Sequence, residues 1–159
     1  MLVLGSFTGI RIGISTVMAI SMSVEIPIAS VTSLEALAYN VNTECDTICS
    51  IIDARNNQVY AGIFDREYNL LEEYIADDIN VVIEALKKYK NIVYVGDGAL
   101  IHKDLLNIEN FEFENVIHAI SIGKCGYKKY KNNKIENADT VVPLYLRKSQ
   151  AERMRNKNG

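Results

Sequence analysis

A segment near the N-terminus, residues 8–22, is apolar on nearly all sides when it is drawn as a helix, and it constrains the fold most. At 100° per residue, one side carries four large apolar side chains: Ile10, Ile14, Val17 and Met18. The opposite side carries Ile12, Thr16, Ala19 and Ile20. A helix with this pattern is buried on two sides. We therefore expect one side to pack on this chain and the other on a second layer or a partner.

The rest of the chain alternates between strand and helix periodicities. Residues 47–54 and 58–66 are β-rich runs on either side of Arg55-Asn56-Asn57, which predicts a hairpin whose turn tolerates positive φ. We expect further strands at 27–33 and 91–96. Helices are expected at 33–41, 79–89, 99–107 and 114–131. Ser33 is the expected cap of the first of these, and the order of elements predicts an α/β fold with a mixed sheet.

Composition favours a folded cytosolic domain. Apolar residues make up 48% of the 159 residues and charged residues 23%, which is enough to build a core. The three cysteines, Cys45, Cys49 and Cys125, are an odd number without a C-x-x-C pair, so neither a disulfide framework nor a zinc site is indicated. No apolar run has the roughly 18 residues that span a bilayer. We expect a cytoplasmic protein without a membrane partner.

Charge is distributed unevenly along the chain. Residues 1–123 hold 7 Lys and Arg against 17 Asp and Glu, whereas residues 124–159 hold 10 against 3. The basic end can meet phosphate or an acidic partner. Only Tyr127 and Tyr130 interleave its positive charges, so a solvated helix surface followed by a tail is the favoured interpretation.

The glycine-rich stretch GSFTGIRIG, Gly5–Gly13, precedes and enters the first helix. Exposed N–H groups at a helix start, with Ser6 or Thr8 as the cap, can hold an anion, so Gly5, Ser6, Thr8 and Gly9 are candidate anion or nucleotide contacts. The stretch is not a Walker A loop, because Ile10 and Arg11 stand where Lys and Ser or Thr are required. Small residues that allow a sharp turn and close packing are the favoured explanation.

Other residues with catalytic chemistry do not combine into a predicted active site. His102 and His118 lack a third ligand at metal spacing. Asp53 can act as a general base, but a carboxylate at a strand end more often caps a turn or pairs with an arginine such as Arg55. The run VGDGA, residues 95–99, reads as a strand-to-helix turn as readily as a nucleotide contact. Cys125 is a lone thiol with no evident base. We expect no catalytic residue, no metal and no cofactor.

Four stretches together resemble the TsaB family, which is also called YeaZ. They are GSFTGIRIG at Gly5–Gly13, SVTSLEALA at Ser30–Ala38, IDARNNQVYAG at Ile52–Gly62 and PLYLR at Pro143–Arg147. The resemblance implies the two-lobed actin-like, Hsp70-like and sugar-kinase-like (ASKHA) fold. It divides the chain into a remnant of the first lobe (1–32), the second lobe (33–147) and a basic tail (148–159). It also implies an N-terminally truncated member, because Leu4 replaces the proline of the family's G-P-G-S-F-T-G motif and only three residues precede it.

The resemblance also implies a function. Members act in threonylcarbamoyladenosine modification of tRNA as non-catalytic subunits that bind TsaD, in an assembly with the ATPase TsaE. It places partner binding on the first helix, at Ile10, Arg11, Ile14, Val17 and Met18, with a homodimer through the same helix as an alternative arrangement. We expect tRNA to be reached through the complex. Two alternatives stay open: a nucleotide-binding enzyme of the kinase-like superfamily and a non-functional truncated remnant.

Overall fold

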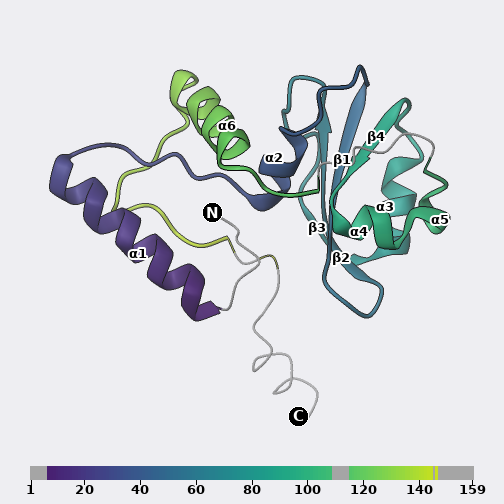
Figure 1. Ribbon diagram of the computed structural model, residues 1–159, viewed down its shortest axis with the longest axis horizontal. Coiled ribbons are helices and arrows are strands. Elements are labelled where there is room, and N and C mark those ends of the chain that lie inside the picture. The colour runs from purple at the N-terminus through teal and green to yellow at the C-terminus, as the bar shows by residue number, and fades with distance from the viewer. Residues whose placement is uncertain (1–6, 109–114, 145, 147–159) are drawn as a thin grey trace, which may run out of the picture.

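The computed structural model describes residues 7–108, 115–144 and 146. A four-stranded mixed sheet, ordered β3-β2-β1-β4, forms one end of the molecule (Figure 1). β1 (Thr47–Asp53) pairs antiparallel with β2 (Gln58–Asp65) and parallel with β4 (Ile92–Val95). β2 also pairs antiparallel with β3 (Ile75–Asp78). The predicted α/β class with a mixed sheet is confirmed.

The β1–β2 hairpin turns at the three residues that the sequence singled out. Arg55, Asn56 and Asn57 have φ values of 64°, 55° and 57°. Asparagine tolerates this left-handed region better than most residues, because its short side chain bonds to nearby backbone. The turn is closed by a bond from the Ala54 amide to the Gln58 carbonyl, at 2.8 Å. The predicted hairpin and its positive-φ turn are therefore confirmed.

Helices cover both faces of the sheet. On one face, Cys49, Ile51 and Ile63 pack with α3 (Ile79–Leu86) and with Leu106 of α5 (Lys103–Leu106). On the other face, Ile48, Ile52 and Phe64 pack with Leu34 and Leu37 of α2 (Ser33–Ala38). Side chains alternate across β1, so the buried strand supplies both cores. Figure 1 shows α2 on one side of the sheet and α3, α4 (Asp97–Ile101) and α5 on the other.

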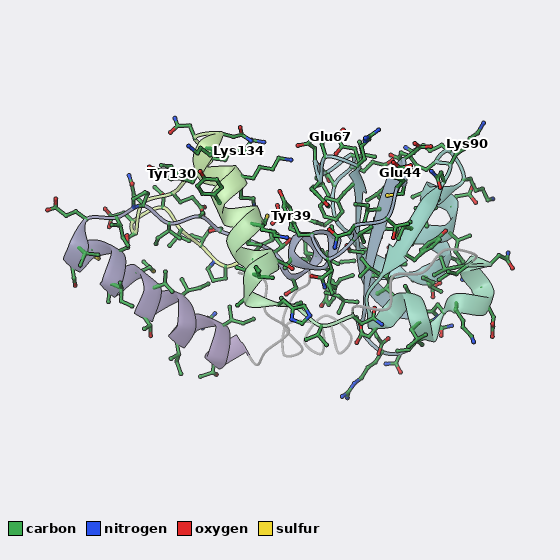
Figure 2. The ribbon with its side chains drawn as sticks, turned by 45° about the horizontal axis from the view of Figure 1, so that its top comes forward. Tyr39, Glu44, Glu67, Lys90, Tyr130 and Lys134 are labelled. Atoms are coloured by element: carbon green, nitrogen blue, oxygen red, sulfur yellow. The ribbon has the colours of Figure 1, made fainter. Side chains whose placement is uncertain are left out.

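A third cluster joins α2 to α6 (Ala119–Lys131). It contains Val31, Ala36, Tyr39 and Cys125, and the Tyr39 ring stacks on Tyr68 with centroids 4.2 Å apart. Tyr39 lies between α6 and the sheet (Figure 2). The cluster therefore fixes α6 on the side of α2 that faces away from the sheet, in the direction of α1 (Phe7–Val24), which stands apart at the other end of the molecule (Figure 1).

Several expected elements differ in the structure. The expected strand at 27–33 is wrong: in the described part of the chain this segment has only isolated bridges, at Ile28 (to Glu136) and at Thr32, and Pro27 cannot donate to a ladder. The helix expected at 99–107 is two short helices separated at His102, whose φ of −104° leaves the helical range. The helix expected at 114–131 begins at Ala119. The cap of α2 is Thr32, not Ser33: its hydroxyl accepts from the Glu35 amide, and the Glu35 carboxylate accepts from the Thr32 amide.

Candidate functional site

The helix α1 is the segment in which the sequence placed partner binding. It runs from Phe7 to Val24 and ends at Glu25, whose φ is 53°. Ser21 closes this end, because its hydroxyl donates to the Ile26 carbonyl at 2.6 Å and its carbonyl accepts from the Ile26 amide at 3.2 Å. The hydroxyls of Thr16 and Ser23 donate to the carbonyls of the residues four positions earlier, so these hydrogen-bond donors are satisfied within the helix. The predicted helix over residues 8–22 is confirmed.

One side of α1 faces the rest of the chain across an apolar groove. Gly13, Ile14 and Val17 line it from α1, and the opposite wall includes Ile28, Val31, Ile122 and Val141. The groove has a volume of about 140 Å³. Ile10, Ile14 and Met18 are half-buried, and Ser21 is buried. The side of α1 that carries Ile10, Ile14 and Val17 thus faces this chain without being fully covered by it.

The other side of α1 is open to solvent. Ile12 is 63% exposed and Met22 is 64% exposed, and Arg11, Ile20 and Val24 are also exposed. Large apolar side chains that stand in solvent on one helix are a feature of interaction surfaces. We use the name α1 surface for Ile10, Arg11, Ile12, Ile14, Val17, Met18 and Met22. It contains the five residues that the resemblance assigned to partner binding, together with Ile12 and Met22.

The candidate anion contacts fall at the start of the same helix. Gly5 and Ser6 lie outside the described residues. Thr8 and Gly9 are exposed in the first turn of α1, which begins at Phe7, so Thr8 lies within the helix and is not its cap.

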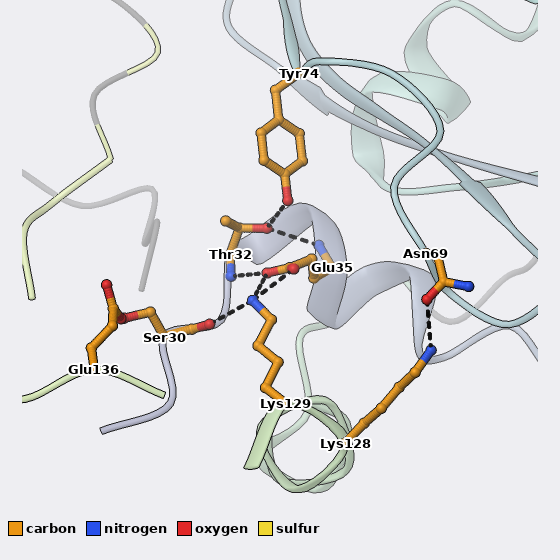
Figure 3. A network of polar contacts seen from close by, with 8 residues as sticks. All are labelled: Ser30, Thr32, Glu35, Asn69, Tyr74, Lys128, Lys129 and Glu136. Atoms are coloured by element: carbon orange, nitrogen blue, oxygen red, sulfur yellow. Dashed lines mark hydrogen bonds and ion pairs between the residues drawn. The ribbon is translucent and has the colours of Figure 1, made fainter. Parts of the chain in front are cut away.

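Two lysines of α6 bind the α2 side of the molecule (Figure 3). The Lys129 ammonium contacts the Glu35 carboxylate at 2.7 and 2.9 Å and donates to the Ser30 carbonyl at 2.6 Å. Lys128 donates to the Glu67 carbonyl and to Oδ1 of Asn69. Glu35 and Lys129 are largely buried, so this pair is shielded from solvent. Part of the basic segment that the sequence singled out is therefore structural.

Asp53 and Arg55 lie together in the β1–β2 turn, where Asp53 binds a backbone amide. Oδ1 of Asp53 accepts from the Arg55 amide at 3.0 Å, and the Asp53 amide donates to Oδ1 of Asp97 at 3.1 Å. Gly96 has a φ of 106°, and a Cβ there would lie 2.1 Å from the Ile51 carbonyl oxygen. At Gly98 a Cβ would lie 2.9 Å from the Asp53 amide nitrogen. Close packing of this turn on β1 explains both glycines.

The remaining candidates are dispersed. His102 is buried and His118 is exposed at the start of α6. Burial raises the pKa of the Cys125 thiol to about 11, with the nearby Glu35 adding to the shift and Lys129 and Lys128 opposing it, so the thiol stays protonated at neutral pH. In the described ranges, no three His, Cys, Asp or Glu side chains gather as a metal site, and no helix there is long and apolar enough to cross a membrane.

Sequence reasoning missed a polar cavity of about 380 Å³ at the end of β1. Its lining includes Asn42, Glu44, Asp46, Arg66 and Tyr68. The Tyr68 hydroxyl donates to the Val41 carbonyl at 3.0 Å, which fixes one wall. These residues come from two loops, 42–46 and 66–68, that the fold brings together. Their local sequence is typical of any surface loop.

Comparison of the amino-acid sequence with known proteins identifies relatives along most of the chain. Residues 5–154 match the family model described as TsaD, tRNA N6-adenosine threonylcarbamoyltransferase. The tRNA threonylcarbamoyladenosine biosynthesis protein TsaB of Bacillus subtilis (strain 168) is 33% identical over 157 residues, covering 93% of this chain and 68% of that protein. The protein of the same name from Buchnera aphidicola subsp. Schizaphis graminum is 35% identical over 103 residues, covering 59% of this chain and 48% of that protein.

A solved structure shows the same fold. YeaZ from Pseudomonas aeruginosa matches with a TM-score of 0.75 and 20% identity, over 89% of this chain and 70% of that chain. The mixed α/β arrangement described above is thus the ASKHA-like fold of the YeaZ structures, as the resemblance implied.

Proposed function

This chain belongs to the TsaB family, and on that premise we propose that it is a non-catalytic accessory subunit that binds a TsaD-like protein and supports threonylcarbamoyladenosine modification of tRNA. The single observation that supports partner binding is the α1 surface. Ile12 and Met22 stand in solvent there, although each is a side chain whose full burial is worth about 1.5–3 kcal/mol. A partner that covers α1 recovers part of that free energy.

The proposed partner covers both the open side of α1 and the groove beside it. Ile14 and Val17 line the groove and remain only partly covered by this chain, so an apolar side chain of the partner can enter between α1 and Val141. The exposed Arg11 borders the apolar residues and gives the surface a charged rim. An apolar centre with a polar rim is the usual arrangement of a protein interface. In the proposed assembly, a TsaE-type ATPase also binds, and the complex as a whole binds tRNA.

The non-catalytic part of the proposal rests on the structural roles of the candidate groups. Asp53 binds the backbone of its own turn, Gly96 and Gly98 pack against β1, and burial keeps Cys125 protonated. Calorimetry with ATP and magnesium separates this proposal from a nucleotide-binding enzyme. We expect no stoichiometric heat of binding, whereas clear binding that an Asp97→Ala variant abolishes favours the enzyme.

Self-association tests the proposed surface without any partner. If the α1 surface is an interface, the chain alone buries it against a second copy, and light scattering will report a mass above that of a monomer at high concentration. Ile14→Lys with Met18→Lys should shift the protein to monomer, and a TsaD-like protein should compete with the self-association of the unaltered chain. A double variant that associates as the unaltered chain does places the interface elsewhere.

A further inference from the structure

The side of α6 that faces solvent combines exposed aromatic rings with positive charge. At 100° per residue, Ile120, Gly123, Lys124, Tyr127, Tyr130 and Lys131 share this side, and Ser121 and Cys125 lie on the buried one. Tyr127 is 61% exposed and Tyr130 is 55% exposed. Figure 2 shows Tyr130 projecting from α6 away from the sheet, with Lys134 just beyond the end of the helix.

The charge of this segment is all of one sign. Residues 119–134 contain five lysines and neither Asp nor Glu. The Lys129 ammonium is paired with the Glu35 carboxylate. The Lys128 ammonium donates to the backbone carbonyl of Glu67 and to Oδ1 of Asn69. Lys124, Lys131 and Lys134 are exposed, and the Lys131 ammonium lies 5.4 Å from the centroid of the Tyr127 ring. Lys128 and Lys129 hold the helix to the rest of the chain, and the exposed Lys124, Lys131 and Lys134 create a positive potential over the two rings.

We propose that this Tyr–Lys face, defined as Lys124, Tyr127, Tyr130, Lys131 and Lys134, binds RNA directly. The three lysines contact phosphates, and the two tyrosine rings stack on unpaired bases. An acidic protein would match the charge, but it gives no reason for two neighbouring rings to stand in solvent, whereas exposed aromatic side chains beside cations are the platform on which single-stranded bases stack. At Gly123, a Cβ would meet nothing within 4 Å, so a bulky ligand can approach the helix backbone there.

The inference rests on the proposed function only for the choice of RNA, which is tRNA. It adds a contact surface on this chain that is separate from the α1 surface, since α6 and α1 are different helices and the Tyr–Lys face contains no residue of the groove between them. The two surfaces can therefore be tested one at a time.

The test measures binding of an unmodified tRNA transcript to the full chain by fluorescence anisotropy across a series of salt concentrations. In Lys124→Ala/Lys131→Ala/Lys134→Ala we expect affinity to fall at least tenfold at low salt. The slope of log K against log salt should decrease by about two to three, because each lost phosphate contact removes roughly 0.7–0.9 from the slope. The control, Lys87→Ala/Lys90→Ala/Lys103→Ala, removes the same charge from exposed lysines elsewhere and should keep most of the affinity.

The tyrosines provide a second, independent readout. Tyr127→Ala/Tyr130→Ala should weaken binding of the transcript about fivefold or more for each stacked base lost. It should weaken binding of a fully paired RNA duplex much less, because a duplex offers no unstacked base. Unchanged melting temperatures of both sets of variants show that the fold is retained.

Three results would overturn the inference: no binding of the transcript by the unaltered chain, equal loss in the control triple variant, or tyrosine variants that bind like the unaltered chain. Lysine variants that bind the transcript normally but no longer capture a TsaD-like protein would assign the face to an acidic protein instead. None of these results depends on the α1 surface. Failure of TsaD capture by α1 variants, in turn, does not affect the RNA measurement.

Discussion

The ammonium of Lys129 lies 2.7 Å from Oε1 of Glu35, and the same carboxylate accepts the Thr32 amide at 2.7 Å through Oε2 (Figure 3). One side chain thus caps α2 and binds a helix 94 residues further along the chain. Because both partners are largely buried, the pair is held in place with little screening by water. Together with the apolar cluster around Tyr39 and Cys125, this pair sets where α6, and therefore the Tyr–Lys face, stands relative to the sheet.

We predict that this pair is energetically coupled. In a double-mutant cycle with Lys129→Met and Glu35→Gln, urea unfolding should give a coupling free energy of about 1–3 kcal/mol, because removing Lys129 alone leaves a partly buried carboxylate without its cation. The matched control is the exposed pair Lys87–Glu84, which should couple by no more than about 0.5 kcal/mol. Equal coupling in the two cycles would contradict the structural role given to Glu35.

The glycines of the chain provide a second prediction. Gly96→Ala should destabilise the protein by several kcal/mol, since it places a Cβ 2.1 Å from the Ile51 carbonyl oxygen at a φ of 106°. Gly123→Ala should stabilise it by roughly 0.5–1 kcal/mol, because Gly123 lies inside α6 and a Cβ there meets nothing within 4 Å. Thermal unfolding of both variants checks the pair. We expect the melting temperature to fall for Gly96→Ala and to rise for Gly123→Ala. An unchanged melting temperature of Gly96→Ala would show that the turn does not pack on β1.

Thiol chemistry should distinguish a buried from a reactive Cys125. With a pKa of about 11, only about 0.1% of this thiol is ionised at pH 8, against about a quarter of an ordinary free thiol. In a Cys45→Ser/Cys49→Ala variant, we expect iodoacetamide to modify Cys125 at least about 100-fold more slowly in buffer than in urea. Comparable rates in the two conditions would make Cys125 an accessible nucleophile.

Stability should fall at alkaline pH. Burial raises the pKa of Tyr94 and of Tyr74 to about 12, above their ordinary values. The unfolded chain therefore releases these protons first, binds fewer of them than the folded chain between about pH 10 and 12, and becomes relatively more stable there. The free energy of unfolding should be independent of these groups below pH 9 and should decline above it, by up to about 1.4 kcal/mol per pH unit for each such group. Tyr94→Phe should reduce the slope, and a slope that Tyr94→Phe leaves unchanged would contradict the burial of that hydroxyl.

Local patterns predicted much of the fold. The hairpin was readable because β-rich runs flank Arg55-Asn56-Asn57, and α1 and α3 were readable from helical spacing of apolar residues. β3 was not, since Ile75–Asp78 has only four residues and two of them are aspartates. Its strand geometry comes from pairing with β2, which is a tertiary effect that local propensity cannot show.

The candidate site was only partly readable. Spacing shows that α1 is apolar on two sides, but not that Ile14 and Val17 face a groove while Ile12 and Met22 stand in solvent. Which side of α1 faces the groove depends on the positions of the segments that contain Ile28 and Val141, which form the opposite wall. The lysines of α6 likewise look equivalent in sequence, and only the position of Glu35 separates the structural Lys129 from the exposed Lys124 and Lys131.

The proposed role depends most on binding of the α1 surface to a TsaD-like protein, and calorimetric titration of the two purified proteins measures it directly. We predict that Ile12→Lys/Met22→Lys weakens binding by at least 100-fold, because two ammonium groups enter an apolar contact. The control, Val81→Lys/Leu100→Lys, makes the same change at exposed apolar residues of α3 and α4 and should bind within about twofold of the unaltered chain. Unaltered binding by the α1 variant, or equal loss in the control, would contradict the assignment of the partner to α1.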